Sequence, residues 1–139
     1  MRDKRRLPVI LDTSIIIHAL ERGVDLIEGL YEASTDPVEI IVPRAVLKEL
    51  ERLEREGDAT RKRKARIALA FLTARKSMVR VTETPEGPTD VVILDLAERL
   101  KGAVATSDTK LWREATKRGL RVFFLWDSRR RIEEYPGTP

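Results

Sequence analysis

Four acidic residues have the type and the setting that a metal-dependent active site requires: Asp12, Glu49, Asp90 and Asp108. Asp12 interrupts the apolar run VILDTSIII at residues 9–17. A buried carboxylate without a partner is costly, so Asp12 needs a cation or hydrogen-bond donors. Carboxylates that converge on one point repel one another unless a divalent cation neutralises them. Such a cation activates water and stabilises charge on a phosphate, so the four acids indicate this chemistry.

Each of these acids also has a purely structural interpretation. Asp90 and Asp108 each open a predicted helix, where aspartate is a preferred N-cap residue. Glu49 lies among other glutamates on a charged helix and could be a solvated side chain. Asp12 is the hardest to explain in this way, because apolar residues flank it on both sides. The combination of the four favours a site more strongly than any one of them does.

Composition limits the kind of metal that such a site could hold. The chain has no cysteine and a single histidine, His18, which excludes thiolate sites and the usual histidine zinc sites. A metal would be held by carboxylates and water, and we therefore expect Mg²⁺ or Mn²⁺. The net charge of +4 is compatible with an anionic partner.

The bulk composition predicts one folded domain. The chain has 139 residues, of which 42% are hydrophobic, enough for a substantial core. It contains no asparagine or glutamine and 36% charged residues, which is typical of thermophilic proteins. No apolar stretch reaches about 18 residues, so we expect no membrane span and a cytoplasmic location.

Strands and helices are predicted to alternate along the chain. The expected strands are residues 7–12, 39–42, 78–82, 103–106 and 120–126. The expected helices are residues 13–33 (broken near Gly23), 43–56, 60–76, 90–101 and 108–118. On the helix at 60–76 we expect Ile67, Leu69, Phe71 and Leu72 to face inward. Residues 127–139 are predicted to be a frayed tail.

This alternation, with nearly continuous apolar strands, predicts an α/β fold whose parallel sheet is covered on both faces. In such sheets the binding crevice lies beyond the carboxyl ends of the strands. Asp12 ends one predicted strand and Asp108 follows another. The predicted fold therefore brings Asp12 and Asp108 to the same edge of the sheet.

Four segments resemble, in order, the four motifs of the PIN-domain nucleases: LDTSIII, VPRAVLKELER, TDVVILDLA and ATSDTKLWREATKRGLRVFFL. The resemblance implies a three-layer α/β/α sandwich with a central parallel sheet. It implies a single domain over residues 1–139, with a core at about 7–126 and a basic tail at 127–139.

The resemblance also implies roles for individual residues. The acids that would bind metal and carry catalysis are Asp12, Glu49, Asp90 and Asp108. The polar residues that would support them are Thr13, Ser14, Thr106 and Ser107. Ser14 stands where many members have asparagine, a departure that bears on hydrogen bonding around the site rather than on the acids themselves. Asp127 is a weaker candidate for an additional site acid.

Basic residues suggest where RNA would bind. The segment TRKRKAR at residues 60–66 holds five basic residues in seven, and Arg44 and Lys48 lie beside Glu49. The candidate RNA-binding residues are Arg44, Lys48, Arg61, Lys62, Arg63 and Lys64. The alternative is a solvated helix face that pairs with the acid-rich helix before it. Three arginines at 129–131 form a second basic cluster.

Few other residues point to nucleic-acid recognition. We expect Trp112 and Trp126 to be core or interface residues rather than stacking platforms for bases. His18 is expected to be a packing residue rather than a base or ligand.

The function implied by the resemblance is that of a metal-dependent endoribonuclease that hydrolyses RNA phosphodiester bonds. The chain is closest in style to the ribosomal-RNA-processing branch, which implies a ribosome-assembly partner. A toxin of a toxin–antitoxin pair, with an antitoxin partner, is the second choice, and the resemblance also implies a homodimer. A PIN fold that binds RNA during assembly without cleaving it is a further alternative. A phosphoaspartyl transferase is disfavoured, because it would need an aspartate at the position of Ser14.

Overall fold

The computed structural model describes residues 5–137, so both ends of the predicted 1–139 domain lie outside it. Its helices are α1 (Thr13–Arg22), α2 (Leu26–Ala33), α3 (Arg44–Glu56), α4 (Ala59–Ala74), α5 (Thr89–Leu100) and α6 (Thr109–Lys117), with a 3₁₀ turn η1 (Lys76–Met78). Its strands are β1 (Leu7–Leu11), β2 (Val38–Pro43), β3 (Arg80–Thr82), β4 (Ala103–Thr106), β5 (Arg121–Leu125) and β6 (Ile132–Tyr135).

One six-stranded sheet forms the centre of the fold, in the order β3-β2-β1-β4-β5-β6. Strands β1 to β5 run parallel, and β6 pairs antiparallel with β5. The predicted parallel sheet is thus confirmed, with one antiparallel edge strand added. Parallel pairing brings the carboxyl ends of β1, β2 and β4 to one edge, the edge where the acids follow the strands.

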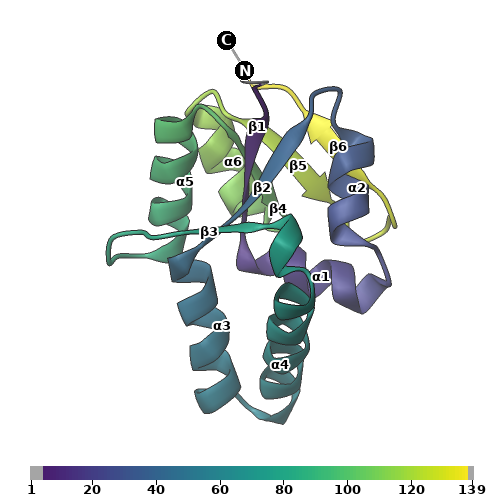
Figure 1. Cartoon of the computed structure of the whole chain (residues 1–139), viewed down its shortest axis with the longest axis vertical. Helices are drawn as coiled ribbons and strands as arrows, with labels where there is room; N and C mark the ends of the chain where they lie inside the picture. The colour runs from purple at the N-terminus through teal and green to yellow at the C-terminus, as the bar shows by residue number, and fades with distance from the viewer. Residues whose placement is uncertain (1–4, 138–139) are drawn as a thin grey trace.

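Helices cover both faces of this sheet. Helices α5 and α6 contact β1, β4 and β5, while α1 and α2 contact each other and pack against β2, β4, β5 and β6. Helices α3 and α4 make the most extensive contact between two helices and form a hairpin that projects beyond the sheet (Figure 1). The structure is therefore the expected α/β sandwich with a helical projection at the carboxyl edge of β2.

The prediction of a frayed tail was wrong. Residues Ile132–Tyr135 form β6, and Ile132 pairs with Leu125 and is only 2% exposed. Two tail arginines, Arg129 and Arg131, pair with Glu133 on β6. The second basic cluster is therefore partly neutralised, and the core extends past residue 126.

Two details of the helices also differ from the prediction. Ile67 on α4 does not face inward but is 49% exposed, because the buried side of α4 is formed by Ala65, Ala68 and Leu72. Helix α4 begins at Ala59 because the carboxylate of Asp58 accepts a hydrogen bond from the N–H of Arg61.

The predicted break near Gly23 is confirmed: that residue ends α1 in the left-handed region, with φ of 69°.

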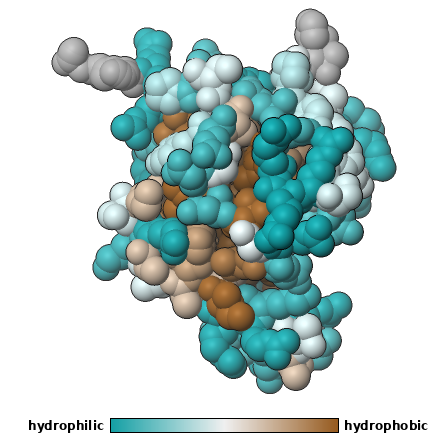
Figure 2. Space-filling model, turned by 90° about the vertical axis from the view of Figure 1, so that its right-hand side faces the viewer, coloured by the Kyte–Doolittle hydropathy of each residue, from teal (hydrophilic) through white to brown (hydrophobic). Residues whose placement is uncertain are grey.

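Most of the surface on the side shown in Figure 2 is hydrophilic, with apolar residues gathered towards its middle. No helix within residues 5–137 combines the length and the apolar character that crossing a membrane would take.

Candidate functional site

Asp12 stands directly after β1 and is 5% exposed. Although it occupies the N-cap position of α1, its side chain makes no capping hydrogen bond. Instead its Oδ2 accepts hydrogen bonds from Ser14 Oγ at 2.6 Å and Thr106 Oγ1 at 2.8 Å. The carboxylate of an N-cap aspartate accepts a hydrogen bond from a backbone N–H of the helix. The carboxylate of Asp12 instead belongs to a cluster of polar side chains where β1 and β4 end.

Buried polar residues occur at one place only within residues 5–137. Asp12, Thr13 and Thr106 are the polar or charged residues that are buried there, at 5%, 7% and 0% exposure. Thr13 donates from Oγ1 to Glu49 Oε1 at 2.6 Å, although the two residues are 36 positions apart. This contact ties helix α3 to the end of β1 and brings the second predicted acid to the site.

The other supporting residues join the same network. The N–H of Ser107 donates to Ser14 Oγ at 3.0 Å, and Ser14 Oγ lies 3.1 Å from Thr106 Oγ1. The N–H of Asp108 donates to Thr106 Oγ1 at 3.0 Å. Thr13, Ser14, Thr106 and Ser107 therefore lie together where β1 and β4 end, hydrogen-bonded to Asp12, to Glu49 or to one another.

His18 has a connection that the sequence did not reveal. Its Nδ1 lies 2.8 Å from Ser107 Oγ, and that hydroxyl donates to the carbonyl oxygen of Leu125. Its Nε2 is 3.2 Å from Asp127 Oδ1, but it is buried and the two atoms are not aligned as a hydrogen bond. His18 is thus mostly buried, with its side chain 14% exposed, and contacts the polar network through Ser107. Its distance of 89 positions from Ser107 explains why no local pattern indicated this.

Asp108 and Asp90 lie at helix starts, with different capping roles. Asp108 is the N-cap of α6, and its Oδ1 accepts from the N–H of Lys110 at 2.9 Å. The capping interpretation therefore holds for one carboxylate oxygen of Asp108. Asp90 is not the cap of α5, because Pro88 occupies that position and Asp90 lies in the first turn.

Burial and the charges of neighbouring acids raise the pKa of two acids of the site, Asp12 and Asp90. Burial raises the pKa of Asp12, against the lowering effect of its bonds from Ser14 and Thr106, and the charges of Asp90 and Glu49 raise it further. Partial burial raises the pKa of Asp90, and the negative charges of Asp108 and Glu49 raise it further. Repulsion among acids is what a bound cation would relieve.

The donor set of this site fits a hard divalent cation. The side chains offer carboxylate and hydroxyl oxygens, the ligands that Mg²⁺ and Mn²⁺ prefer. Within residues 5–137, however, no three acidic or histidine side chains stand close enough together to hold a metal as they are placed. The oxygens therefore suit the ion, while some carboxylates would have to rotate to share it.

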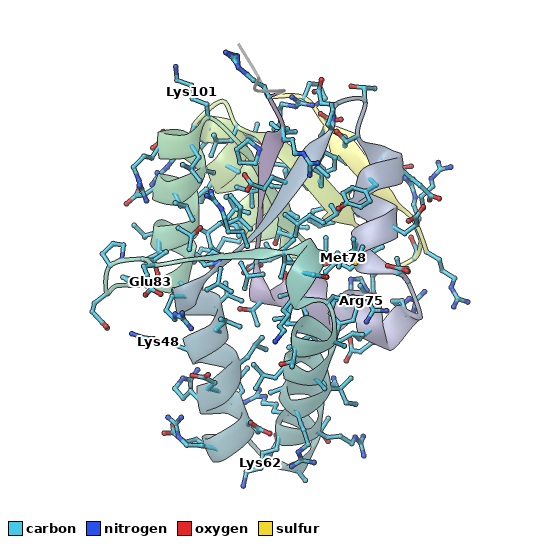
Figure 3. All side chains as sticks on the ribbon, in the orientation of Figure 1. Lys48, Lys62, Arg75, Met78, Glu83 and Lys101 are labelled. Carbon is cyan, nitrogen blue, oxygen red and sulfur yellow. The ribbon has the colours of Figure 1, made fainter. Side chains whose placement is uncertain are left out.

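A cleft adjoins Glu49 on the side of α3. It has a volume of about 220 Å³ and is lined by Ala45, Lys48, Glu49, Arg52, Thr84, Pro85, Glu86, Gly87 and Thr89. Both predicted basic residues near this cleft are paired: Arg44 with Glu83 at 2.9 Å and Lys48 with Glu86 at 3.3 Å. Figure 3 shows Lys48 and Glu83 on neighbouring segments. These pairs are exposed, so they are weak and open to exchange for a phosphate.

The basic run on α4 divides into two groups. Arg66 lies 3.5 Å from Glu54 on α3, the acid-rich helix that the solvated-face interpretation named, whereas Lys64 pairs with Glu21 on α1. Arg61, Lys62 and Arg63 have no ion pair among the described residues. Figure 3 shows Lys62 at the far tip of the hairpin of α3 and α4. The structure keeps Arg44 and Lys48 near Glu49, as the sequence indicated, whereas Lys62 of the basic run lies at the opposite end of the hairpin.

A mostly parallel α/β sheet with a polar, acid-lined carboxyl edge places this protein among the α/β sandwich domains. The family model for the PIN like domain matches residues 9–128, and the chain belongs to this family. A comparison with curated protein sequences gives no significant match.

Solved structures agree with this assignment. The PIN domain endonuclease Utp24 superposes with a TM-score of 0.76 at 24% identity, over 93% of this chain and 91% of that one. A domain of a functionally unknown protein from Methanocaldococcus jannaschii gives 0.65 at 25% identity, over 86% and 91%. VapBC-1 from nontypeable Haemophilus influenzae gives 0.56 at 16% identity, over 86% and 96%. The predicted family and fold are confirmed.

Proposed function

We propose that this protein is a metal-dependent endoribonuclease. The observation that carries the proposal is the buried polar cluster: within residues 5–137, the buried polar side chains all belong to the network around Asp12. Burying such groups is costly, and a fold needs them only where they hold something in place. Utp24, whose fold this chain shares, is a PIN domain endonuclease, which supports the same class of activity.

The four acids would share the work of holding Mg²⁺ or Mn²⁺. Asp12 has one oxygen committed to hydroxyl donors, so its Oδ1 would be the ligand; Glu49, Asp90 and Asp108 would supply the others. When bound, the cation would supply an activated water and stabilise charge on the phosphate. Thr13 orients Glu49, and Ser14 with Thr106 orients Asp12, so the hydroxyls fix the carboxylates that ligate.

RNA would approach along the hairpin of α3 and α4. Arg61, Lys62 and Arg63 carry charge that no described side chain neutralises, and such cations bind phosphates. Arg44, Lys48 and Lys64 would join once RNA displaces their exposed glutamate partners. We place the protein in the cytoplasm, in keeping with this substrate.

Among the branches of the family, we favour ribosomal-RNA processing with a ribosome-assembly partner. The support is the similarity of the segment RGLRVFFLW and the basic run on α4 to that branch. A toxin role would instead require an antitoxin partner. A homodimer is compatible with either branch.

A cleavage assay tests the proposed activity. Purified protein is incubated with structured RNA in Mn²⁺, in Mg²⁺ and in EDTA, beside the variants Asp12→Asn and Asp108→Asn. We expect cleavage in either metal, none in EDTA, and a loss of more than about 100-fold in both variants. RNA binding that is indifferent to EDTA, with no cleavage in Mn²⁺, would instead establish a non-cleaving RNA-binding domain. Full activity in Asp12→Asn would refute the proposal.

A further inference from the structure

A groove runs along α6, directly beyond the acid that opens this helix. It has a volume of about 620 Å³ and is lined by Thr109, Trp112, Arg113, Thr116, Lys117, Tyr135 and Pro136. The α6 residues recur at the spacing of one helix face. Thr109 follows Asp108, and the stretch to Lys117 spans about 12 Å along the helix axis. The groove therefore starts at the candidate site and leads away from it.

Aromatic rings form the floor of this groove. Trp112 packs against Phe124 at 4.8 Å and against Tyr135 at 5.0 Å between ring centroids. Both Trp112 and Tyr135 stay partly accessible while they contact the core. The indole N–H of Trp126 is bonded to Tyr135 Oη at 2.8 Å, whereas that of Trp112 has no such partner among residues 5–137. Trp112 was expected to be a core or interface residue, and it is both a core contact and a groove residue.

Positive charge borders the aromatic floor. Arg113 is exposed and has no ion pair within the described part of the chain. Lys117 has a side chain that is 73% exposed, and its contact to Glu114 is long, at 3.6 Å. None of the residues that line the groove is acidic. The groove thus offers rings for stacking and cations for an anionic backbone.

We propose that this groove binds the single-stranded segment of RNA that flanks the cleaved bond, an inference that rests on the proposed function. Aromatic rings beside a basic rim are the arrangement that binds single strands, because unpaired bases expose faces for stacking. A length of about 12 Å holds a few stacked nucleotides at about 3.4 Å each. A duplex would bring phosphates to Arg113 and Lys117 but no free base face to Trp112.

Tryptophan fluorescence tests this assignment without any catalysis. The chain has two tryptophans, so the variants Trp112→Phe and Trp126→Phe each leave one reporter. The probe is a 12-nucleotide oligoadenylate, titrated in EDTA as a single strand and as a duplex with oligouridylate. We expect the single strand to quench Trp126→Phe, which retains Trp112, but to leave Trp112→Phe nearly unquenched. The duplex should quench neither.

Charge variants provide the second arm of the test. Arg113→Gln with Lys117→Gln should weaken single-strand binding by about 5-fold or more, and should lower the slope of log affinity against log salt by about 1.4. The matched control is Arg99→Gln with Lys101→Gln, which removes the same charge at the end of α5. Figure 3 shows Lys101 at the end of the molecule opposite the hairpin. The control should bind within about 2-fold of the parent protein.

The outcomes separate this proposal from the proposed function. Quenching through Trp112 together with the loss in the groove variant supports the groove, whatever the cleavage assay gives. Equal binding by the groove variant and its control overturns the groove assignment, and so does wild-type protein that fails to bind the single strand. Cleavage that persists in that case leaves the ribonuclease proposal standing.

Discussion

At the residue scale, two hydroxyls define how Asp12 is held. Ser14 and Thr106 both donate to one oxygen of its carboxylate, Oδ2, and the other oxygen accepts no hydrogen bond from the described residues. The sequence indicated Asp12 because a carboxylate inside an apolar run is costly to bury unless it has a partner. It could not show that Thr13 reaches Glu49 or that His18 reaches Ser107, because those contacts join residues far apart in the chain.

Removal of one of these hydroxyls should weaken the metal site without unfolding the protein. We expect Thr106→Val, which keeps the shape of the side chain, to reduce Mn²⁺ affinity by about 10- to 100-fold, because a partner that orients a ligand is lost. Calorimetric titration measures this. The control is Thr116→Val on α6, which should leave Mn²⁺ affinity unchanged. Equal affinity in both variants would show that the hydroxyl of Thr106 does not orient the ligand.

The raised pKa values make stability of the metal-free protein depend on pH. Asp12 and Asp90 have a pKa above 3.8 in the folded state, so between 3.8 and the raised value the folded state binds more protons than the unfolded state. The free energy of unfolding therefore falls as the pH rises through this window. Above it, the ionised carboxylate of buried Asp12 lowers stability, and that of the more exposed Asp90 lowers it less because solvent screens its charge.

Replacement of Asp12 by asparagine should remove part of this cost. We expect metal-free Asp12→Asn to be more stable than the parent protein at pH 7, and the difference to shrink as the pH falls towards 3.8. Urea unfolding in EDTA at a series of pH values measures both effects. A variant that is less stable at pH 7 would show that the hydrogen bonds to the carboxylate outweigh its burial.

At the element scale, the sequence predicted the first five strands but not the sixth. The interiors of β1, β2 and β4 are almost wholly apolar, and that pattern predicts parallel strands buried on both faces. β6 reads IEEY, in which one buried isoleucine is followed by charged residues. Its place is set by pairing with β5 and by ion pairs such as Arg121 with Glu134, which involve other parts of the chain. The groove beside Trp112 was hidden for the same reason, because Tyr135 belongs to β6.

A pair of isoleucine variants tests whether β6 belongs to the core. We expect Ile132→Ala to lower the free energy of unfolding by about 2–4 kcal/mol, because Ile132 is 2% exposed and packs with the core. Ile67→Ala removes the same atoms from a side chain that is 49% exposed and should change stability by less than about 0.5 kcal/mol. Urea denaturation measures both. Equal effects would contradict the place of β6 in the core.

At the scale of the whole molecule, some ion pairs join into small networks, while others are isolated contacts. Arg118 bridges Asp95 and Glu98, and Arg121 bridges Asp36 and Glu134. Networks of this kind contribute most at high temperature, because the cost of desolvating charges falls as temperature rises. The composition, which has neither asparagine nor glutamine, is the basis of the thermophilic prediction, which thermal unfolding has to test.

Thermal unfolding tests that indication. We expect a midpoint above about 65 °C, the upper end of the range for mesophilic domains, and a lower midpoint in 1 M salt, which screens exposed pairs. Circular dichroism at 222 nm as a function of temperature measures the midpoint. A transition within about 45–65 °C would be ordinary for a mesophilic domain and would contradict the expectation.

Above all, we expect the carboxylate at the end of β1 to bind a divalent cation. Calorimetric titration of Mn²⁺ into the metal-free protein and into Asp12→Asn tests this most directly, with circular dichroism confirming that both are folded. We predict that the wild type binds Mn²⁺ and that Asp12→Asn loses this binding. Equal binding by the two proteins, or no binding by either, would contradict this role and leave Asp12 as a hydrogen-bond acceptor that holds β1 and β4 together.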